Sequence, residues 1–318
     1  MFLNKAVVKR LFKRLLWRIY PSLFERVVHC YGQVFSIAIY EGKDLLSLKD
    51  SVDVINPVLS ANDVKEVPAA FVADPFVIYI NQKRYMFFEV YNKIFRRGEI
   101  GLAISQDGRK WSFECIVLRE PFHLAYPYVF NWDKNFYMIP ESNSNGVRLF
   151  KAKQFPYKWE LIRLMFDGDG FVDSSIFCFK NKWWLFTAKS QKTSDPKTLY
   201  LYYADKPTGP WMEHSANPIV EHNDTISRPA GKVIMMNGRP IRFAQESIPK
   251  YGSSVRAFEV LELSTTKYIE REIGSNPILS GGNESWRSGG MHHIDAHLLP
   301  EGGWIAYVDG WFQNEPMN

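Results

Sequence analysis

Phe71-Val72-Ala73-Asp74-Pro75-Phe76-Val77 is an apolar, strand-like stretch with a single carboxylate in its middle. A similar stretch returns later in the chain as Phe171-Val172-Asp173-Ser174-Ser175-Ile176-Phe177. Each copy is followed by a polar turn and then by an aromatic-rich run, Tyr85-Met86-Phe87-Phe88 in the first and Trp183-Trp184-Leu185-Phe186 in the second. A carboxylate inside a buried strand costs free energy unless it is paired or used. The two stretches therefore predict a repeat protein with carboxylates at its centre.

Strand starts of this kind recur along the whole chain, near Asp74, Pro127, Asp173, Pro229 and His293. Their spacing of roughly 46 to 64 residues is close to the length of a four-stranded propeller blade. A tryptophan follows three of the starts, at Trp111, Trp159 and Trp211, and an Asn-Pro pair precedes three, at Asn56-Pro57, Asn217-Pro218 and Asn276-Pro277. Two markers in the same phase predict an all-β fold, a five-bladed β-propeller.

The last repeat is incomplete, because residues 291–311 have room for only two strands. Residues 33–41 and the stretch around 45–54 can supply the other two, so the fifth blade is expected to be closed by N- and C-terminal strands. Such closure leaves no open sheet edge. The chain is thus expected to comprise a helical segment at 1–30 and a propeller at 31–318.

The N-terminal segment has a different pattern. Apolar residues recur at helical spacing from Leu3 to Phe24, and residues 1–26 contain seven Lys/Arg and one acid. This predicts an amphipathic helix with a basic face, interrupted at Pro21. Its apolar runs are too short to span a bilayer, and its order of charges is not that of a signal peptide. Two interpretations are open: a helix lying on an anionic membrane surface, or one packed on the body or on a protein partner.

The rest of the chain is nearly neutral, which argues against a nucleic-acid-binding surface. The three cysteines, Cys30, Cys115 and Cys178, are an odd number without metal-ligand spacing, and they are expected to be reduced thiols in the core. This predicts a cytoplasmic protein, peripheral at the inner face of the cell membrane if the basic helix binds lipid.

The polar residues of the strand starts should meet at one site, because the inner strands of a propeller converge on its axis. Those expected from the inner strands are Asp74, Tyr126, Asp173, Arg228, His293 and Asp295, and those from the second strands are Glu89, Glu141 and Glu246. Acids, bases and aromatic rings in one pocket suit a sugar or sugar phosphate. The alternatives are that the aspartates bond to backbone N–H groups and that the glutamates pair with arginines such as Arg148 or Arg242. His292, His293 and His297 are interpreted as structural, and no residue is assigned as a metal ligand.

Several motifs carry a resemblance that covers roughly residues 70–311. They are Ala73-Asp74-Pro75-Phe76, Phe122-His123-Leu124-Ala125-Tyr126-Pro127, Tyr137-Met138-Ile139-Pro140-Glu141, Asp173-Ser174-Ser175-Ile176, Trp183-Trp184-Leu185-Phe186, Leu201-Tyr202-Tyr203-Ala204, Arg228-Pro229-Ala230-Gly231 and His292-His293-Ile294-Asp295. At these residues the chain resembles the five-bladed propellers of the arabinanase, levansucrase and invertase kind. It is most similar to the N-terminal domain of glucosamine inositolphosphorylceramide transferases and to stand-alone relatives in polysaccharide biosynthesis.

The resemblance implies a base at Asp74 and an acidity-tuning aspartate at Asp173, as in the hydrolase propellers. It fails at the general acid, because the fourth blade opens with Arg228-Pro229-Ala230-Gly231 and the nearest replacement is Glu246. Glycoside hydrolysis needs a general acid, whereas a phosphate leaving group departs without protonation and is stabilised by a positive charge. The departure therefore favours glycosyl transfer, with Asp74 as base, Glu141 and Asp173 orienting the sugars, and Arg228 near a phosphate.

The function expected is that of a glycosyltransferase of cell-envelope or capsular polysaccharide or glycolipid biosynthesis. Its partners would be a sugar nucleotide or other phosphate-activated sugar, an oligosaccharide or lipid-linked acceptor, and an anionic membrane surface, but no nucleic acid. A divalent cation such as Mg²⁺ or Mn²⁺ could accompany the donor. Two alternatives stay open, a glycoside hydrolase with Glu246 as acid, and a non-catalytic carbohydrate-binding propeller that assists a partner transferase.

Overall fold

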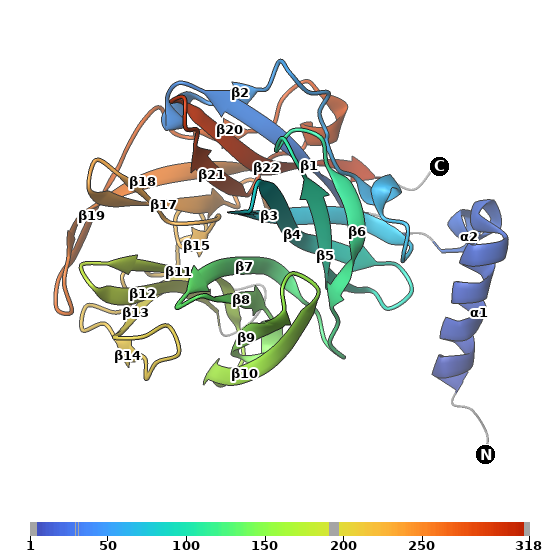
Figure 1. Cartoon of the computed structure of the whole chain (residues 1–318), viewed down its shortest axis with the longest axis horizontal. Helices are drawn as coiled ribbons and strands as arrows, with labels where there is room; N and C mark the ends of the chain where they lie inside the picture. The colour runs from blue at the N-terminus through green and yellow to red at the C-terminus, as the bar shows by residue number, and fades with distance from the viewer. Residues whose placement is uncertain (1–4, 29, 31, 191–196, 315–318) are drawn as a thin grey trace.

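The computed structural model describes residues 5–28, 30, 32–190 and 197–314. Two helices, α1 (Lys5–Ile19) and α2 (Pro21–Val27), precede five β-sheets arranged in a ring (Figure 1). The predicted five-bladed propeller and the interruption of the helix at Pro21 are both confirmed.

The blades are numbered in the order in which their inner strands occur in the chain, and the strands of each blade are given from the axis outward. Blade 1 contains β3 (Ala69–Ile80), β4 (Lys83–Asn92), β5 (Arg97–Ser105) and β6 (Ser112–Leu118). Blade 2 contains β7 (Ala125–Trp132), β8 (Asn135–Glu141), β9 (Val147–Gln154) and β10 (Lys158–Phe166). Blade 3 contains β11 (Phe171–Phe179), β12 (Lys182–Lys189), β13 (Thr198–Ala204) and β14 (Met212–Glu213). Blade 4 contains β15 (Arg228–Pro229), β17 (Arg239–Glu246), β18 (Ser254–Leu263) and β19 (Tyr268–Glu272), with β16 (Ile234–Met236) on β17 and β20 (Leu279–Ser280) on β18.

Blade 5 closes the ring with strands from both ends of the chain, as the sequence predicts. It contains β21 (Ile294–Leu298), β22 (Trp304–Asn314), β1 (Gly32–Gly42) and β2 (Lys49–Asp50). The strands β1 and β22 pair antiparallel along their whole length, from Gly32 opposite Asn314 to Gly42 opposite Trp304. The two ends of the propeller are therefore joined by a continuous backbone ladder.

The recurring tryptophans pack each blade against the blade before it. Trp111 of blade 1 meets Tyr307 of blade 5 edge to face, at 5.4 Å between ring centroids. Trp159 of blade 2 meets Phe87 of blade 1 in the same way at 5.5 Å. Aromatic pairs at such distances stabilise beyond the area that they bury. This contact explains why the tryptophan recurs with the period of the blade.

The recurring Asn-Pro pairs have a hydrogen-bonding role. The side chain of Asn56 accepts from the Ile39 N–H and donates to the Ile39 carbonyl, both at 2.9 Å. Asn217 makes the same two bonds to Leu201, and Asn276 makes them to Ala257. In these three blades the amide thus provides an acceptor for a backbone N–H of the third strand and adds a second donor to the carbonyl of the same residue, which also accepts from a backbone N–H.

The helices pack against the propeller at the turn between β4 and β5. Leu16 of α1 and Phe24 of α2 are buried with Val28 against Ile94, in the turn between β4 and β5. Among the described residues, no helix combines the length and apolar content needed to cross a membrane. The prediction of core cysteines is wrong for Cys178, which is exposed. Cys30 and Cys115 are half-buried, and Cys115 packs against the hydrophobic core.

Candidate functional site

The inner strands of blades 1 to 3 are distorted at one equivalent position. Asp74, Tyr126 and Asp173 have φ values of 55°, 44° and 48°, in the left-handed region that non-glycine residues rarely adopt. At each of them the register of the inner strand shifts against the second strand. Such bulges redirect side chains and persist where the surroundings hold them, often at functional sites.

A cavity of about 630 Å³ lies at the end of the propeller where the inner strands begin. Its polar lining includes Asp74, Glu89, His123, Glu141, Arg228 and His292, and its aromatic lining is Phe35, Phe71, Tyr91 and Tyr251. The structure thus brings together four residues that the sequence predicts, Asp74, Glu89, Glu141 and Arg228. Asp173 lies directly behind them, since it is bonded to Arg228.

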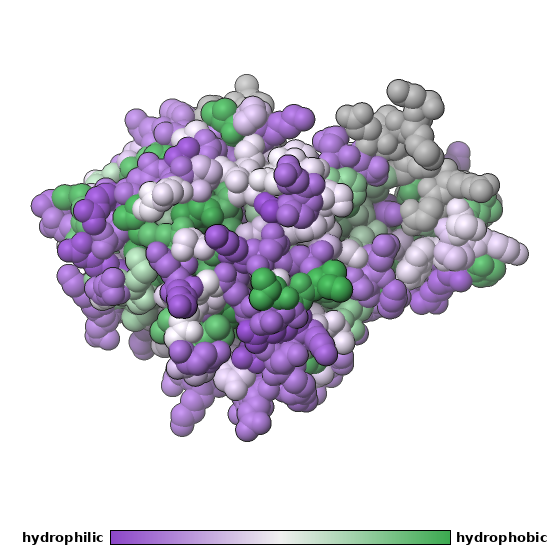
Figure 2. Space-filling model, turned by 90° about the horizontal axis from the view of Figure 1, so that it is seen from above, coloured by the Kyte–Doolittle hydropathy of each residue, from purple (hydrophilic) through white to green (hydrophobic). Residues whose placement is uncertain are grey.

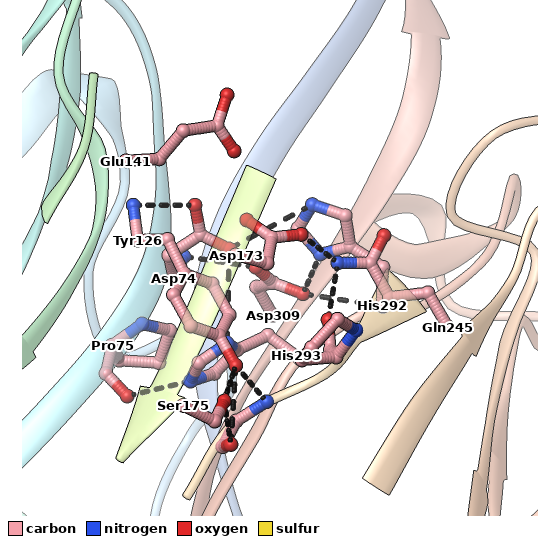
Figure 3. Close-up of polar contacts among 12 residues, drawn as sticks. Asp74, Pro75, Tyr126, Glu141, Asp173, Ser175, Gln245, His292, His293 and Asp309 are labelled. Carbon is pink, nitrogen blue, oxygen red and sulfur yellow. Dashed lines mark hydrogen bonds and ion pairs between the residues drawn. The ribbon is translucent and has the colours of Figure 1, made fainter. Parts of the chain in front are cut away.

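Asp74 occupies the centre of this polar group (Figure 3). Its Oδ2 accepts a hydrogen bond of 3.2 Å from the Tyr126 N–H, and its Oδ1 lies 3.8 Å from His292 Nε2 and 3.7 Å from His293 Nδ1. The side chain is 7% exposed. Burial raises the pKa of Asp74 to about 7, and the neighbouring carboxylates add to this increase while His292 opposes it. A carboxyl group with this pKa can exchange a proton near neutral pH.

His292 is held in place by Asp309 of β22. Its Nδ1 lies 2.7 Å from Asp309 Oδ1, and the other oxygen of Asp309 accepts from the Asp74 N–H at 2.9 Å. Burial lowers the pKa of His292, but Asp309 outweighs burial and the pKa is raised overall. Asp309 was not among the residues that the sequence indicated, although it is a second-strand carboxylate between apolar neighbours, the same signal that identifies Glu89.

A second network joins Asp173, Arg228 and Glu141. Asp173 Oδ2 accepts from Arg228 Nε and, at 2.7 Å, from Gln245 Nε2, while Arg228 Nη2 donates to Glu141 Oε2 at 3.3 Å. The guanidinium also lies over the Tyr251 ring, 4.9 Å from its centroid. Burial raises the pKa of Asp173 to about 7 even though Arg228 favours the ionised form. Arg228 is therefore already neutralised by two acids.

Glu89 faces the cavity without a hydrogen bond to one of its oxygens. The side chain is buried, and Glu89 Oε1 has no hydrogen-bond partner among the described residues. The imidazole of His123 lies beside it, with Nε2 3.7 Å from Glu89 Oε1. Burial raises the pKa of Glu89 well above its ordinary value, and four nearby carboxylates raise it further. A buried oxygen without a partner at a cavity wall is suited to accept a hydrogen bond from a ligand.

His123 is a cavity residue to which sequence reasoning assigned no role. Its Nδ1 accepts a 2.9 Å hydrogen bond from the Gly98 N–H, so in the neutral ring Nε2 carries the proton and points toward Glu89. Burial lowers the pKa of His123 to about 4, which keeps the ring neutral. Gly98 is required here because a Cβ at this position would lie 2.1 Å from the Leu124 carbonyl oxygen and 2.6 Å from Glu89 Oε1.

Three further residues that the sequence indicates are near the axis but do not line the cavity. The Tyr126 hydroxyl lies 2.8 Å from Ser175 Oγ and accepts from the Gly231 N–H at 2.6 Å, so it joins blades 2, 3 and 4. His293 Nε2 lies 3.0 Å from the Pro75 carbonyl. Asp295 accepts from the Val77 N–H at 2.6 Å and pairs with Lys232 at 3.3 Å. These contacts hold the blades together along the axis.

Glu246, the residue expected to replace the hydrolase acid, is also outside the cavity lining. It pairs with Arg256 at 3.0 Å and accepts from Ser254 at 2.7 Å. Burial would raise the pKa of Glu246, but the hydrogen bonds from Arg256 and Ser254 outweigh burial and lower it. A carboxylate held ionised in this way is a poor proton donor.

Among the residues that the structure describes, one group of side chains is close enough to share a cation. A ligand atom each of Asp74, His292 and Asp309 lies within 4.8 Å of the others. Two carboxylates and an imidazole suit a divalent metal. The same atoms are already used within the protein, since Asp309 bonds to both His292 and the Asp74 N–H. The group is therefore compatible with a cation but is also held together without one.

Residues 31–311, nearly the whole propeller, match the family described as "Glucosamine inositolphosphorylceramide transferase 1, N-terminal". The chain is 33% identical over 297 residues to glucosamine inositolphosphorylceramide transferase 1 of Oryza sativa subsp. japonica, and 33% identical over 265 residues to that of Arabidopsis thaliana. These alignments cover 87% and 81% of this chain but only 40% and 34% of the relatives, so the chain spans well under half of their length.

Solved structures confirm the propeller fold at low sequence identity. A β-1,2-mannobiose phosphorylase from Listeria innocua superposes with a TM-score of 0.61 at 14% identity, over 85% of this chain and 96% of its own. A thermostable family-43 glycoside hydrolase gives a TM-score of 0.58 at 15% identity, over 83% and 98% of the two chains. An α-L-arabinanase of Cellvibrio cellulosa gives 0.55 at 14% identity, over 74% and 90%. At such identities the likeness extends to the fold alone.

Proposed function

Because the chain belongs to the family of the N-terminal part of glucosamine inositolphosphorylceramide transferase 1, we propose that it acts on sugars as a glycosyltransferase of glycolipid or envelope polysaccharide synthesis. The observation that carries the proposal is the cavity in which Asp74, Glu89 and Glu141 face aromatic rings. Carboxylates bind sugar hydroxyls and aromatic rings pack against the apolar faces of sugars. Such a lining of apolar walls with a few polar groups is typical of small-ligand sites.

Asp74 is proposed as the base. Its carboxylate would accept the proton of an acceptor hydroxyl while that oxygen forms a bond to the anomeric carbon of the donor sugar. The bond from this carbon to the phosphate oxygen would break, and the phosphate would leave with the electron pair. A pKa of about 7 makes Asp74 a stronger base than an exposed aspartate, and His292 beside it stabilises the ionised form before the reaction.

The donor phosphate requires a cation. Arg228 is already paired with Asp173 and Glu141, so its first role in the proposal is to hold these two acids in the cavity wall. Arg96 also lines the cavity and is exposed at its lip, in the turn after β4. We place the phosphate near Arg96. The guanidinium of Arg228 could also bind the phosphate if its ion pair with Glu141 opens. A divalent cation on the donor phosphates is compatible with this arrangement.

A non-catalytic role in sugar binding is the second candidate. It is favoured by one observation, that the chain spans well under half the length of the transferases it matches. In this case the same cavity would bind an acceptor sugar for a partner transferase. The hydrolase alternative lacks support from the site, because Glu246 is paired with Arg256 and lies outside the cavity lining.

The experiment that tests the proposal uses the purified chain with a panel of sugar nucleotides and free oligosaccharides, with and without Mg²⁺ or Mn²⁺. Binding is measured by calorimetry and thermal shift, and turnover by nucleotide release in the presence of an acceptor. A sugar nucleotide that is turned over by the wild type but not by Asp74→Asn supports the transferase. The matched control is Glu246→Gln, which changes a carboxylate outside the cavity and should keep full turnover. Binding of free sugars without turnover would instead favour the binding role.

The place of the protein in the cell is also a proposal. The basic helix is expected to hold it at the inner face of the cell membrane, where anionic lipids attract Lys and Arg. In cell fractionation, removal of residues 1–28 should release the protein from the membrane fraction. Unchanged membrane association after this deletion would remove the support for the helix as anchor.

A further inference from the structure

The helix α1 carries an apolar surface that the propeller does not cover. Of its apolar residues, Leu16 is buried, whereas Val7, Val8, Leu11, Phe12, Leu15 and Ile19 are 40–60% exposed. The cations Lys5, Lys9, Arg10, Arg14 and Arg18 are exposed on the same helix, which contains no acid. Figure 2 shows the helical segment projecting from one end of the body, with apolar and charged residues on its surface. Exposed apolar groups combined with positive charge alone match an anionic lipid surface.

The direction of the strands fixes the end of the propeller at which the helix lies. The cavity is lined from the starts of inner strands, at Asp74 and Ala125, and from the ends of second strands, at Glu89 and Glu141. Because β4 runs antiparallel to β3, the turn that follows β4 lies at this same end. That turn contains Ile94, against which Leu16 packs.

Further contacts place the helix beside the opening of the cavity. The guanidinium of Arg10 lies 5.4 Å from the centroid of the Phe95 ring, and the next residue, Arg96, lines the cavity. In Figure 1 the helices stand on the side of the molecule where β3 begins and β22 ends. The opposite ends of the blades, with turns such as Lys180-Asn181, face away from the helix.

A second hollow lies beside the helix and next to the cavity. It has a volume of about 620 Å³ and is lined by Trp17 of α1, by Lys65 and by Lys93. Cys30, Val34 and Ala70 line both this hollow and the cavity, so the two share a wall. The hollow next to α1 and the cavity that contains Asp74 are therefore adjacent.

We infer that α1 lies on an anionic membrane and turns the opening of the cavity toward the bilayer, so that the cavity receives the polar headgroup of a membrane lipid as acceptor. The choice of ligand rests on the proposed function, whereas the orientation rests on the helix contacts alone. A headgroup at the bilayer surface could enter along the hollow beside Trp17 without leaving the membrane. Lys65 and Lys93 in this hollow suit the phosphate of such a headgroup.

The native cysteines allow a direct test of the orientation. Cys30 lines the cavity next to the helix, whereas the exposed Cys178 lies near the far end of β11, close to the Lys180-Asn181 turn. Two single-cysteine proteins, Cys115→Ser/Cys178→Ser and Cys30→Ser/Cys115→Ser, are labelled with an environment-sensitive NBD maleimide. They are mixed with vesicles of phosphatidylcholine containing phosphatidylserine, or of phosphatidylcholine alone.

The expected result is a blue shift and increased emission of the label at Cys30 with anionic vesicles only, and no change at Cys178. Equal responses of the two labels, or a response at Cys178 alone, would overturn the orientation. Failure of the unlabelled wild type to pellet with anionic vesicles would overturn the inference altogether.

A pair of variants assigns the binding to the helix. Leu11→Glu/Leu15→Glu should weaken vesicle binding at least about tenfold, because it places two acids on the lipid-facing surface. The control is Val52→Glu/Ile55→Glu, which makes the same change at apolar residues that are 96% and 92% exposed outside the helix, and it should bind as the wild type does. An equal loss in the two variants would show that overall charge, rather than α1, determines binding.

The ligand and the orientation can fail separately. Sugar binding measured without vesicles tests the proposed function, and the label at Cys30 tests the orientation. A shifted label with no sugar bound would remove the proposed function and leave the membrane orientation standing. Sugar binding with an unresponsive label at Cys30 would remove the membrane orientation and leave the proposed function standing.

Discussion

The raised pKa of Asp74 predicts that Asp74→Asn makes the protein more stable, and increasingly so as the pH rises. Asp74 ordinarily ionises near pH 3.8, but burial raises its pKa in the folded protein to about 7. Between these values the folded state binds more protons at Asp74 than the unfolded state does. Stability therefore falls as the pH rises through this window. Asparagine is the appropriate substitution because it is neutral and tolerates the φ of 55° at this position.

The size of the effect follows from the two pKa values. The free energy of unfolding of the wild type should be lower than that of Asp74→Asn by about 1.5 kcal/mol at pH 5 and by about 4 kcal/mol at pH 8. The difference should therefore grow by about 2.5 kcal/mol over this range. For a chain of 318 residues the unfolding entropy converts this increase into about 4 °C of melting temperature.

The assay is thermal unfolding of the wild type and Asp74→Asn from pH 5 to pH 8, at constant ionic strength. Asp169→Asn serves as control, because the Asp169 side chain is exposed in a turn and should give no growing difference. A melting-temperature difference that stays constant with pH would refute the argument that burial raises the pKa. Destabilisation of Asp74→Asn at every pH would show that the Tyr126 N–H and His292 hold Asp74 ionised. The proposed base role adds that turnover should rise with pH to a plateau above about 7.

Three further substitutions probe the site and the axis. Gly231→Ala should destabilise the fold by on the order of 3 kcal/mol in denaturant unfolding, because its Cβ would lie 1.8 Å from the Ile294 carbonyl oxygen. The control Gly238→Ala also has a positive φ but has open space around it, so it should cost only about 1 kcal/mol. Equal costs of the two variants would contradict the steric argument. Lys232→Met should cost about 1–3 kcal/mol, because the buried Asp295 loses one of its two basic partners and keeps only His297, 3.0 Å away. Addition of Asp295→Asn should recover part of that loss. No recovery would mean that packing, and not charge, causes the loss. Glu89→Ala should weaken binding of the sugar ligand by about 10- to 100-fold in calorimetry, because a buried hydrogen bond to the ligand is lost. The control Glu246→Ala should leave the affinity unchanged, because Glu246 lies outside the cavity lining. Equal affinities of the two variants would exclude Glu89 from the sugar site.

The blades could be predicted from the sequence because their markers have a fixed physical role in each repeat. Trp111 and Trp159 pack against the preceding blade, and Asn56 bonds to the third strand, so their spacing follows the period of the fold. The positions of Asp74 and Asp173 could also be predicted, as carboxylates inside apolar runs. Their backbone geometry could not, because the left-handed φ comes from a bulge that the neighbouring strands impose.

The partners of the second-strand acids were beyond the reach of the sequence. Glu89 and Glu246 both lie near the ends of second strands, but Glu89 stands opposite Ile100, whereas Glu246 stands opposite Ser254 and reaches Arg256. The neighbouring strand thus decides which acid faces the cavity without a cation and which is neutralised. The same limit applies to Arg228, whose position could be foreseen but whose pairing with Asp173 and Glu141 could not.

The closure of the ring by β1 and β22 has a consequence for the order of events during synthesis. These strands come from opposite ends of the chain, so their ladder cannot form until residue 314 has left the ribosome. The helix α1 precedes every blade and emerges before any of them. If α1 binds lipid as inferred above, capture by the membrane can come first, while the sheets are still being translated. The cavity takes part of its wall from β1 and would then be completed only after the nascent chain is already at the lipid surface.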